Sequence, residues 1–391
     1  KRLAFGARLS LDHIDMEGYL PSTEAAGASG AAGAANDNAS EISGGTAAVD
    51  GASPSATPNP LAVLTALTKF DANLKASIGE VIHQGTSIRK IAFDGTLFSG
   101  ALTVKNASVA DLAGASASVS GILSELGGNP RFGDLQAEFK AKSIQKLTKL
   151  LAIDLPISAK DIGAVSAAVA LDGPVLQPSV KGSASAAGLQ GTFDGGISLL
   201  PIKDLVDGTV TLKHGDVAKL LRVLGVSYSP SGKIGGVNVS TRISGGVDRI
   251  NLDNLVGAIG AVKFNGSTKI QLGRNVPEVS ATINTNEFTV DPFLPAKQSA
   301  SATQGFDVVA RPVISSGAPW PDDPLDLSAL KGLNGDFRIH SDAINYGSYH
   351  LEDADVVATL NDGILKADRV TANLFGGRVN VKGLLNAQGT P

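Results

Sequence analysis

Alternation of apolar and polar residues over residues 335–385 constrains the fold of this chain more than any other feature. The alternation stops at Gly347, at an Asn-Asp-Gly that ends on Gly363, and at a Gly-Gly pair further on. Between these stops every second residue is apolar, as in the run from Val356 to Leu360. Period-two patterning bounded by turn residues is typical of antiparallel strands with one apolar and one polar side. The Asp-Gly pair predicts a hairpin turn, because it tolerates the positive φ values that such turns need.

The rest of the chain contains looser copies of this pattern. Residues 262–272 form the cleanest one, since every second residue of that stretch is apolar or small. Short helices are predicted near residues 61–70, 143–152 and 215–225, where apolar residues recur at helical spacing. We therefore predict a mainly β fold: an elongated, curved antiparallel β-sheet that forms a groove from repeated hairpins, with a few short α-helices.

Composition supports a thin sheet over a compact enzyme. Hydrophobic residues make up 43% of the 391 residues, but aromatic residues only 5%. Compact cores draw much of their buried area from aromatic side chains. The absence of Cys excludes disulfides and thiol chemistry. A net charge of −4 with scattered Lys and Arg argues against a nucleic-acid partner.

Internal similarity predicts five segments. We expect residues 1–21 to be the end of a preceding repeat, 22–59 a low-complexity linker, 60–295 a β-groove module, 296–323 a second linker and 324–391 the start of a second copy. Self-similarity at a fixed spacing is typical of stacked, open-ended architectures. The chain begins inside an alternating strand without an initiator Met. This favours a fragment, with any membrane anchor outside it.

Two repeated stretches support this division. The sequence Glu-Gly-Tyr-Leu-Pro at 17–21 is matched by Asp-Pro-Phe-Leu-Pro at 291–295. Each is followed by a run of small residues and then by a Pro-Leu pair, at Pro60 and at Pro324. The two copies therefore have the same order of strand, linker and helix.

A sheet of this kind must bury a continuous aliphatic side. Either the side chains fill the space between its walls, or an apolar ligand occupies a trough. Such a trough suits acyl chains, because each buried CH₂ contributes about 0.8 kcal/mol without directional contacts. The alternative is a filled β-solenoid or sandwich core. The residues predicted to line a lipid groove are Phe93, Leu97, Val165, Val169, Val237, Val239, Val262, Phe264, Ile270, Leu272, Val356 and Leu360.

The C-terminal stretch resembles the AsmA family of Gram-negative envelope proteins, which is related to bridge-like lipid-transfer proteins. The resemblance lies in Leu-Phe-Gly-Gly-Arg-Val at 374–379, preceded by Asp-Gly-Ile-Leu at 362–365 and Leu-Glu-Asp-Ala at 351–354. The motif at 291–295 and the Leu-Asp-Leu at 325–327 are also similar to that family. The earlier copy departs from the pattern, with Ala-Gly-Ala at residues 113–115 in place of Phe-Gly-Gly.

This resemblance implies a location and a role. AsmA-like proteins are anchored in the inner membrane by an N-terminal helix and project a β-rich groove into the periplasm. The chain would then lie in the periplasm, anchored through a segment not present here. It would bind or conduct phospholipid or another acyl-chain lipid and support outer-membrane biogenesis, with outer-membrane assembly proteins as further partners.

No reactive constellation suggests an enzyme, and we expect no catalytic residue, cofactor or metal. Among the five His, His340 and His350 lie near Asp342, Glu352 and Asp353 in sequence, a set of metal-ligand types. A polar outer strand face explains them more simply. The competing function is a non-lipid scaffold for outer-membrane protein targeting and assembly. A β-solenoid enzyme acting on polysaccharide would need clustered carboxylates on one exposed face.

Overall fold

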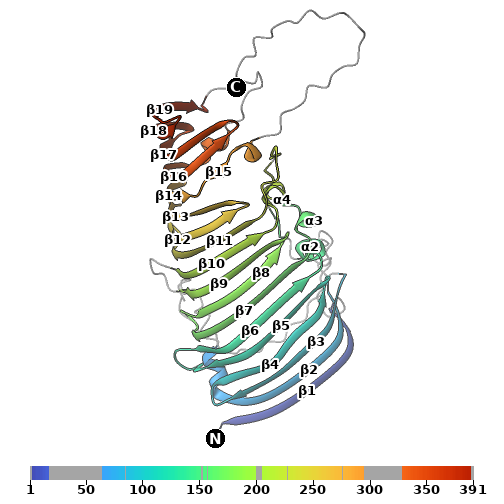
Figure 1. Ribbon diagram of the computed structural model, residues 1–391. Coiled ribbons are helices and arrows are strands. Elements are labelled where there is room, and N and C mark those ends of the chain that lie inside the picture. The colour runs from blue at the N-terminus through green and yellow to red at the C-terminus, as the bar shows by residue number, and fades with distance from the viewer. Residues whose placement is uncertain are drawn as a thin grey trace, which may run out of the picture.

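The described part of the chain forms one open, curved sheet of 19 strands with a few short helices, which confirms the predicted mainly β fold. Figure 1 shows the strands stacked in chain order from β1 at the N-terminal end to β19 at the other. The structure is a computed structural model that describes residues 2–16, 64–83, 85–150, 153–155, 157–199, 205–226, 228–274, 276–294 and 328–388.

Most strands are joined to their chain neighbours as antiparallel pairs. This holds for every consecutive pair from β2 to β14 and from β16 to β19. The strands are β1 (Leu3–Asp15), β2 (Phe70–His83), β3 (Thr86–Phe98), β4 (Ala101–Leu112), β5 (Ala115–Ser124), β6 (Arg131–Ala141), β7 (Val165–Pro174), β8 (Ser179–Ala186), β9 (Leu189–Ile197), β10 (Val206–His214), β11 (Val237–Gly245), β12 (Arg249–Ile259), β13 (Val262–Gln271), β14 (Glu278–Thr285), β15 (Phe288–Thr289), β16 (Asn334–Tyr346), β17 (Tyr349–Asn361), β18 (Ile364–Leu374) and β19 (Gly377–Asn386).

Two steps in the sheet are parallel, where the sequence predicted antiparallel pairing throughout. β1 pairs with β2 in parallel, and β14 and β15 pair in parallel with β16. Parallel neighbours need a long connection that returns the chain to the same edge, and a segment of that length precedes each of β2 and β16. The predicted linkers 22–59 and 296–323 lie in these connections, outside the described residues. The assignment of two copies stays a prediction, although the same topological step occurs at both places.

The helices are short and differ in part from expectation. Residues 64–66 are α-helical and η3 (Leu67–Lys69) follows, but Phe70 begins β2 where a helix was predicted to residue 70. The other two predictions are confirmed by α2 (Gln145–Leu150) and α4 (Val217–Val223). The four-residue helix α3 (Ala159–Ile162) was not expected. Figure 1 shows α2, α3 and α4 along one margin of the sheet.

Short 3-10 turns flank the second parallel step. These are η4 (Asp291–Phe293) and η5 (Ser328–Lys331). The carboxylate of Asp291 accepts a hydrogen bond from the amide of Gly347 at 3.0 Å, and the hydroxyl of Tyr228 donates to the carbonyl oxygen of Phe293. The Asp-Pro-Phe-Leu-Pro motif thus ties the α4–β11 connection to the β16–β17 turn.

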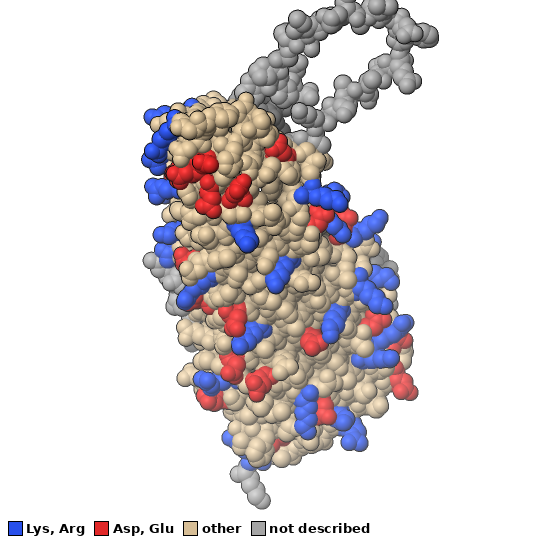
Figure 2. Space-filling model, in the orientation of Figure 1, with Lys and Arg blue, Asp and Glu red and all other residues tan. Residues whose placement is uncertain are grey.

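The two sides of the sheet differ in chemistry. In β13, Val262 and Phe264 project to one side, which we call the apolar face, and Lys263 and Asn265 project to the other, the polar face. Exposed cross-strand ion pairs lie on the polar face, such as Lys75 with Asp94 at 3.2 Å. In Figure 2, Lys and Arg side chains are mixed with Asp and Glu over the visible surface. This mixture of both signs is typical of a surface in contact with water.

One polar cluster near the first strands should make stability depend on pH. The carboxylate of Glu80 accepts hydrogen bonds from the hydroxyl of Ser87 and, at 3.0 Å, from Nε of Arg89. The Ser87 hydrogen bond, followed by that of Arg89, lowers the pKa of Glu80 below its ordinary value of 4.5. A lowered folded-state pKa contributes stability that is present above the unfolded value and is lost as the pH falls through the folded value.

We therefore expect Glu80→Gln to be less stable than the unmodified protein at pH 7, with the difference shrinking as the pH falls below 4.5. Urea unfolding midpoints measured from pH 7 to pH 3 would check this. A difference that stays constant over the whole range would show that the ionised carboxylate of Glu80 contributes nothing to the pH dependence.

Candidate functional site

The pairing register gathers alternate residues of neighbouring strands onto the apolar face. Val262 of β13 lies opposite Ile259 of β12, which lies opposite Val237 of β11. Phe264 lies opposite Gly257, which in turn lies opposite Val239. Because directly paired residues project to the same side of a sheet, these positions form continuous rows across the strands. The apolar face is therefore one surface that runs through consecutive strands.

All the predicted lining residues fall on this face when the pairings are followed from strand to strand. Those in β3, β7, β11, β13 and β17 share the side of Phe264, and Leu272 continues the alternation just after β13 ends. Leu97 and Leu360 are buried, Leu272 is 41% exposed and the others are half-buried. That they contact a lipid stays a prediction.

The apolar face is only partly covered by the protein itself. Within the described residues the strands contact their sheet neighbours, and no second sheet lies on this face. Large apolar side chains that project from it remain accessible along the array, with Phe5 56%, Leu212 41% and Val381 50% exposed. A filled core would have reduced such side chains to a few per cent.

The rings of Phe93 and Phe264 lie flat over glycines of the sheet and do not extend into the space above it. A Cβ at Gly95 would lie 2.7 Å from Cζ of Phe93, and a Cβ at Gly257 would lie 2.5 Å from Cζ of Phe264. Each ring thus occupies the volume that a side chain at the glycine would fill. Rings packed flat on the strands add apolar area to the face and leave the space above it open.

Other glycines mark places where neighbouring backbones crowd together on the apolar face. A Cβ at Gly266 would lie 2.0 Å from the carbonyl oxygen of Thr282, and one at Gly335 would lie 2.1 Å from that of Val279. On the inside of a bend, groups from adjacent strands converge. Contacts of this kind are expected on the inner side of a curled sheet, and the trough expected from the sequence would lie on this face.

His214 is a polar residue on the apolar face that the sequence did not mark as part of it. Its side chain is 6% exposed. Nδ1 accepts a hydrogen bond from the amide of Asp216 at 3.0 Å, and Nε2 donates to the carbonyl oxygen of Ala187 at 3.1 Å. Both ring nitrogens are used, so His214 offers no free nitrogen for catalysis or metal binding. It connects the end of β10 to the β8–β9 turn and to the start of α4.

Of the two other histidines singled out in the sequence, His340 lies on the polar face, and His350 is exposed near the start of β17. His340 in β16 has Nδ1 at 3.1 Å from Oδ1 of Asp355 in β17, and Nε2 of His350 is 3.5 Å from Oε1 of Glu352. Asp355 was missed by the sequence reasoning, although it shares the parity of Asp353 and directly faces His340 in the register. The contact between His340 and Asp355 depends on the alignment of β16 with β17, which the sequence alone does not give.

No helix among the described residues is long and apolar enough to cross a membrane. Comparison of this chain with protein-family models, with curated proteins and with solved structures finds no match. The candidate site is therefore defined by its geometry alone: a continuous, half-exposed apolar face of a curved sheet.

Proposed function

We propose that this chain binds phospholipid acyl chains along its apolar face and conducts them along the array. The observation that carries the proposal is the continuity of this face from strand to strand, with large apolar side chains left half-exposed. Exposed apolar patches of this extent are uncommon in soluble proteins and mark binding surfaces. The expected occupant is long, apolar and without fixed polar groups in its middle.

Acyl chains match these requirements. Hydrophobic burial is non-directional and proportional to the area removed from water. A chain of about 16 CH₂ groups therefore gains on the order of 13 kcal/mol before the costs of binding, at about 0.8 kcal/mol per group. The gain changes little as the chain slides past successive strands, because Val, Ile and Leu side chains offer no directional contact that must be broken. A headgroup would remain in water at the open side.

The resemblance of residues 374–379 to the AsmA family extends the proposal to a cellular role. We propose that the chain is the periplasmic part of an inner-membrane-anchored protein that supports outer-membrane biogenesis. The competing function is a scaffold for outer-membrane protein assembly, which would use the same sheet without lipid. The two proposals differ in whether the apolar face is occupied by acyl chains.

Photo-crosslinking from adjacent residues of one strand tests this difference. A benzoylphenylalanine at position 264 projects from the apolar face, and one at position 265 projects from the polar face of the same strand. With phospholipid vesicles or lipid retained from the cell, we expect mass spectrometry to detect lipid adducts at position 264 at least tenfold above position 265. Equal labelling at the two positions, or none at either, would refute lipid binding on the apolar face and favour the scaffold.

A further inference from the structure

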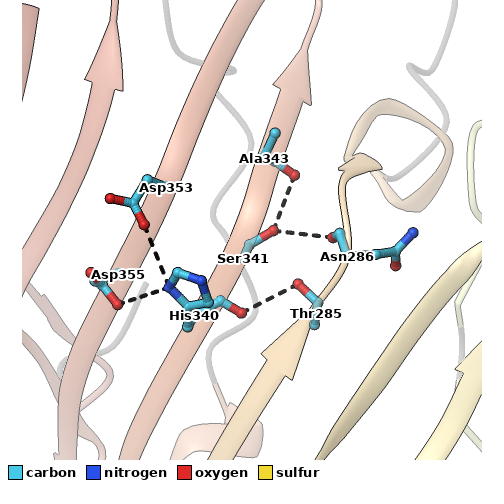
Figure 3. Close-up of polar contacts among 7 residues, drawn as sticks. All are labelled: Thr285, Asn286, His340, Ser341, Ala343, Asp353 and Asp355. Atoms are coloured by element: carbon cyan, nitrogen blue, oxygen red, sulfur yellow. Dashed lines mark hydrogen bonds and ion pairs between the residues drawn. The ribbon is translucent and has the colours of Figure 1, made fainter.

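Three metal-ligand side chains from two neighbouring strands converge on the polar face. Nδ1 of His340 lies 3.1 Å from Oδ1 of Asp355 and 4.0 Å from Oδ1 of Asp353. The three ligand atoms all lie within 4.8 Å of one another. Figure 3 shows both carboxylates directed toward the same edge of the imidazole ring. We propose that His340, Asp353 and Asp355 form a binding site for a divalent transition metal, with Zn²⁺ as the best match.

The backbone holds the ligands in this arrangement. Asp355 lies directly opposite His340 in the β16–β17 register. Asp353 adopts a positive φ of 53° at an irregularity of β17, where the pairing with β18 shifts between Glu352 and Asp355. The local twist of such irregularities re-aims side chains. It brings the second carboxylate to within 4.0 Å of the nitrogen that the first already contacts.

His340 is held from its other side by a buried hydrogen-bond network. The hydroxyl of the adjacent Ser341, only 1% exposed, donates to the carbonyl oxygens of Asn286 at 3.3 Å and Ala343 at 3.0 Å. The hydroxyl of Thr285 donates to the carbonyl oxygen of His340 itself at 3.5 Å. Ligands whose backbone is already fixed lose little freedom when a metal binds.

Two of the three groups are carboxylates, and both converge on Nδ1 of the imidazole. Nδ1 can donate one hydrogen bond, and Asp355 is the carboxylate within reach of it. The Asp353 carboxylate lies beyond hydrogen-bond distance from that nitrogen and converges on the same point. Two carboxylates this close together repel each other. A divalent cation would attract both, by binding one oxygen from each Asp and the lone pair of neutral Nδ1.

The ligand set selects the class of metal. One imidazole nitrogen with two carboxylate oxygens suits Zn²⁺ and its transition-metal neighbours, whereas Ca²⁺ and Mg²⁺ prefer oxygen ligands throughout. The side chains of His340, Asp353 and Asp355 are 37%, 66% and 44% exposed, which leaves room for water in the remaining positions. The metal would join β16 to β17 beside the second parallel step, on the side of the sheet opposite the lipid trough.

Calorimetric titration of the metal-free 391-residue protein with ZnCl₂ tests this site. We expect one Zn²⁺ per chain, and at least tenfold weaker binding for His340→Ala, Asp353→Asn and Asp355→Asn. The two Asn variants keep the shape of the side chain at exposed positions, so they should fold. MgCl₂ is expected to give no comparable binding.

The matched control is His350→Ala. His350 lies in the same strand pair, but its Nε2 has Glu352 as the acidic partner at 3.5 Å, and it is not part of the three-residue cluster. This variant should bind Zn²⁺ as the unmodified protein does. Zn²⁺ should also raise the melting temperature of the unmodified protein and of His350→Ala but not of Asp353→Asn. Undiminished binding by His340→Ala, or equal loss in His350→Ala, would overturn the assignment.

Discussion

Replacing Gly266 by alanine is expected to lower the stability of the protein by about 3 kcal/mol, the upper part of the range for an overpacked site. The new Cβ would lie 2.0 Å from the carbonyl oxygen of Thr282 and 3.0 Å from Cα of Ile283. Both are backbone atoms of β14, so no side chain can rotate away. β13 and β14 would have to separate, which weakens the hydrogen bonds between them. Urea unfolding at pH 7 measures the loss.

Gly383 provides the matched control for this substitution. It lies on the apolar face of β19. Gly383 pairs with Ala367 of β18, and Ala367 pairs with Ala358 of β17, which is on that face. A Cβ at Gly383 would meet no atom within 4 Å. Gly383→Ala should therefore change stability by less than about 0.5 kcal/mol, or raise it slightly by restricting the unfolded chain. Equal losses for the two variants would show that glycine does not serve backbone approach at position 266.

Local pattern was enough to predict the strands and their apolar side. Alternation has a period of exactly two, so Val262, Phe264 and Ile270 must share a side whatever lies next to them. The turn after Asn361 could also be predicted, because Asp362 and Gly363 adopt the positive φ values of 48° and 76° that a two-residue hairpin turn demands. Both features depend on residues adjacent in sequence.

Features that depend on distant segments could not be predicted in the same way. Leu61, Leu64 and Leu67 have helical spacing, but Phe70 lies opposite Leu3 in β1, and its ring stacks on that of Phe5 with centroids 5.5 Å apart. Pairing with a strand more than 50 residues earlier in the chain therefore ends the helix before residue 70.

The role of the glycines and the convergence of acidic groups also required the structure. The alternation places Gly95 and Gly266 on the apolar side without showing what lies beside them. In the structure, Gly95 is covered by the ring of Phe93, and Gly266 faces the backbone of β14. Asp355 became a candidate ligand only when the register placed it opposite His340. Each of these contacts joins positions on different strands or depends on a rotamer, and the alternation pattern specifies neither.

A charge placed in the middle of the trough should stop lipid movement along it, if the proposed function is correct. Val169 lies on the apolar face in β7, opposite Ala137 of β6 and Gly182 of β8. We expect Val169→Asp to reduce phospholipid transfer between donor and acceptor vesicles at least tenfold. A carboxylate against an acyl chain loses its hydration without a partner, which costs several kcal/mol. Transfer of a fluorescent phospholipid gives the rate.

The adjacent Ala168→Asp is the control, because Ala168 lies opposite Ser183 and Glu138 on the polar face and is exposed. It adds the same charge to the same strand and should leave transfer unchanged. If Val169→Asp does not fold, Val169→Thr places a hydroxyl at the same point with nearly the same volume and should slow transfer by a smaller factor. In the proposed function every acyl chain passes along the same face, so one charged residue there limits the transfer rate of the whole array. Charged residues on the polar face do not limit it. Equal transfer by Val169→Asp and Ala168→Asp would mean that acyl chains do not pass over β7.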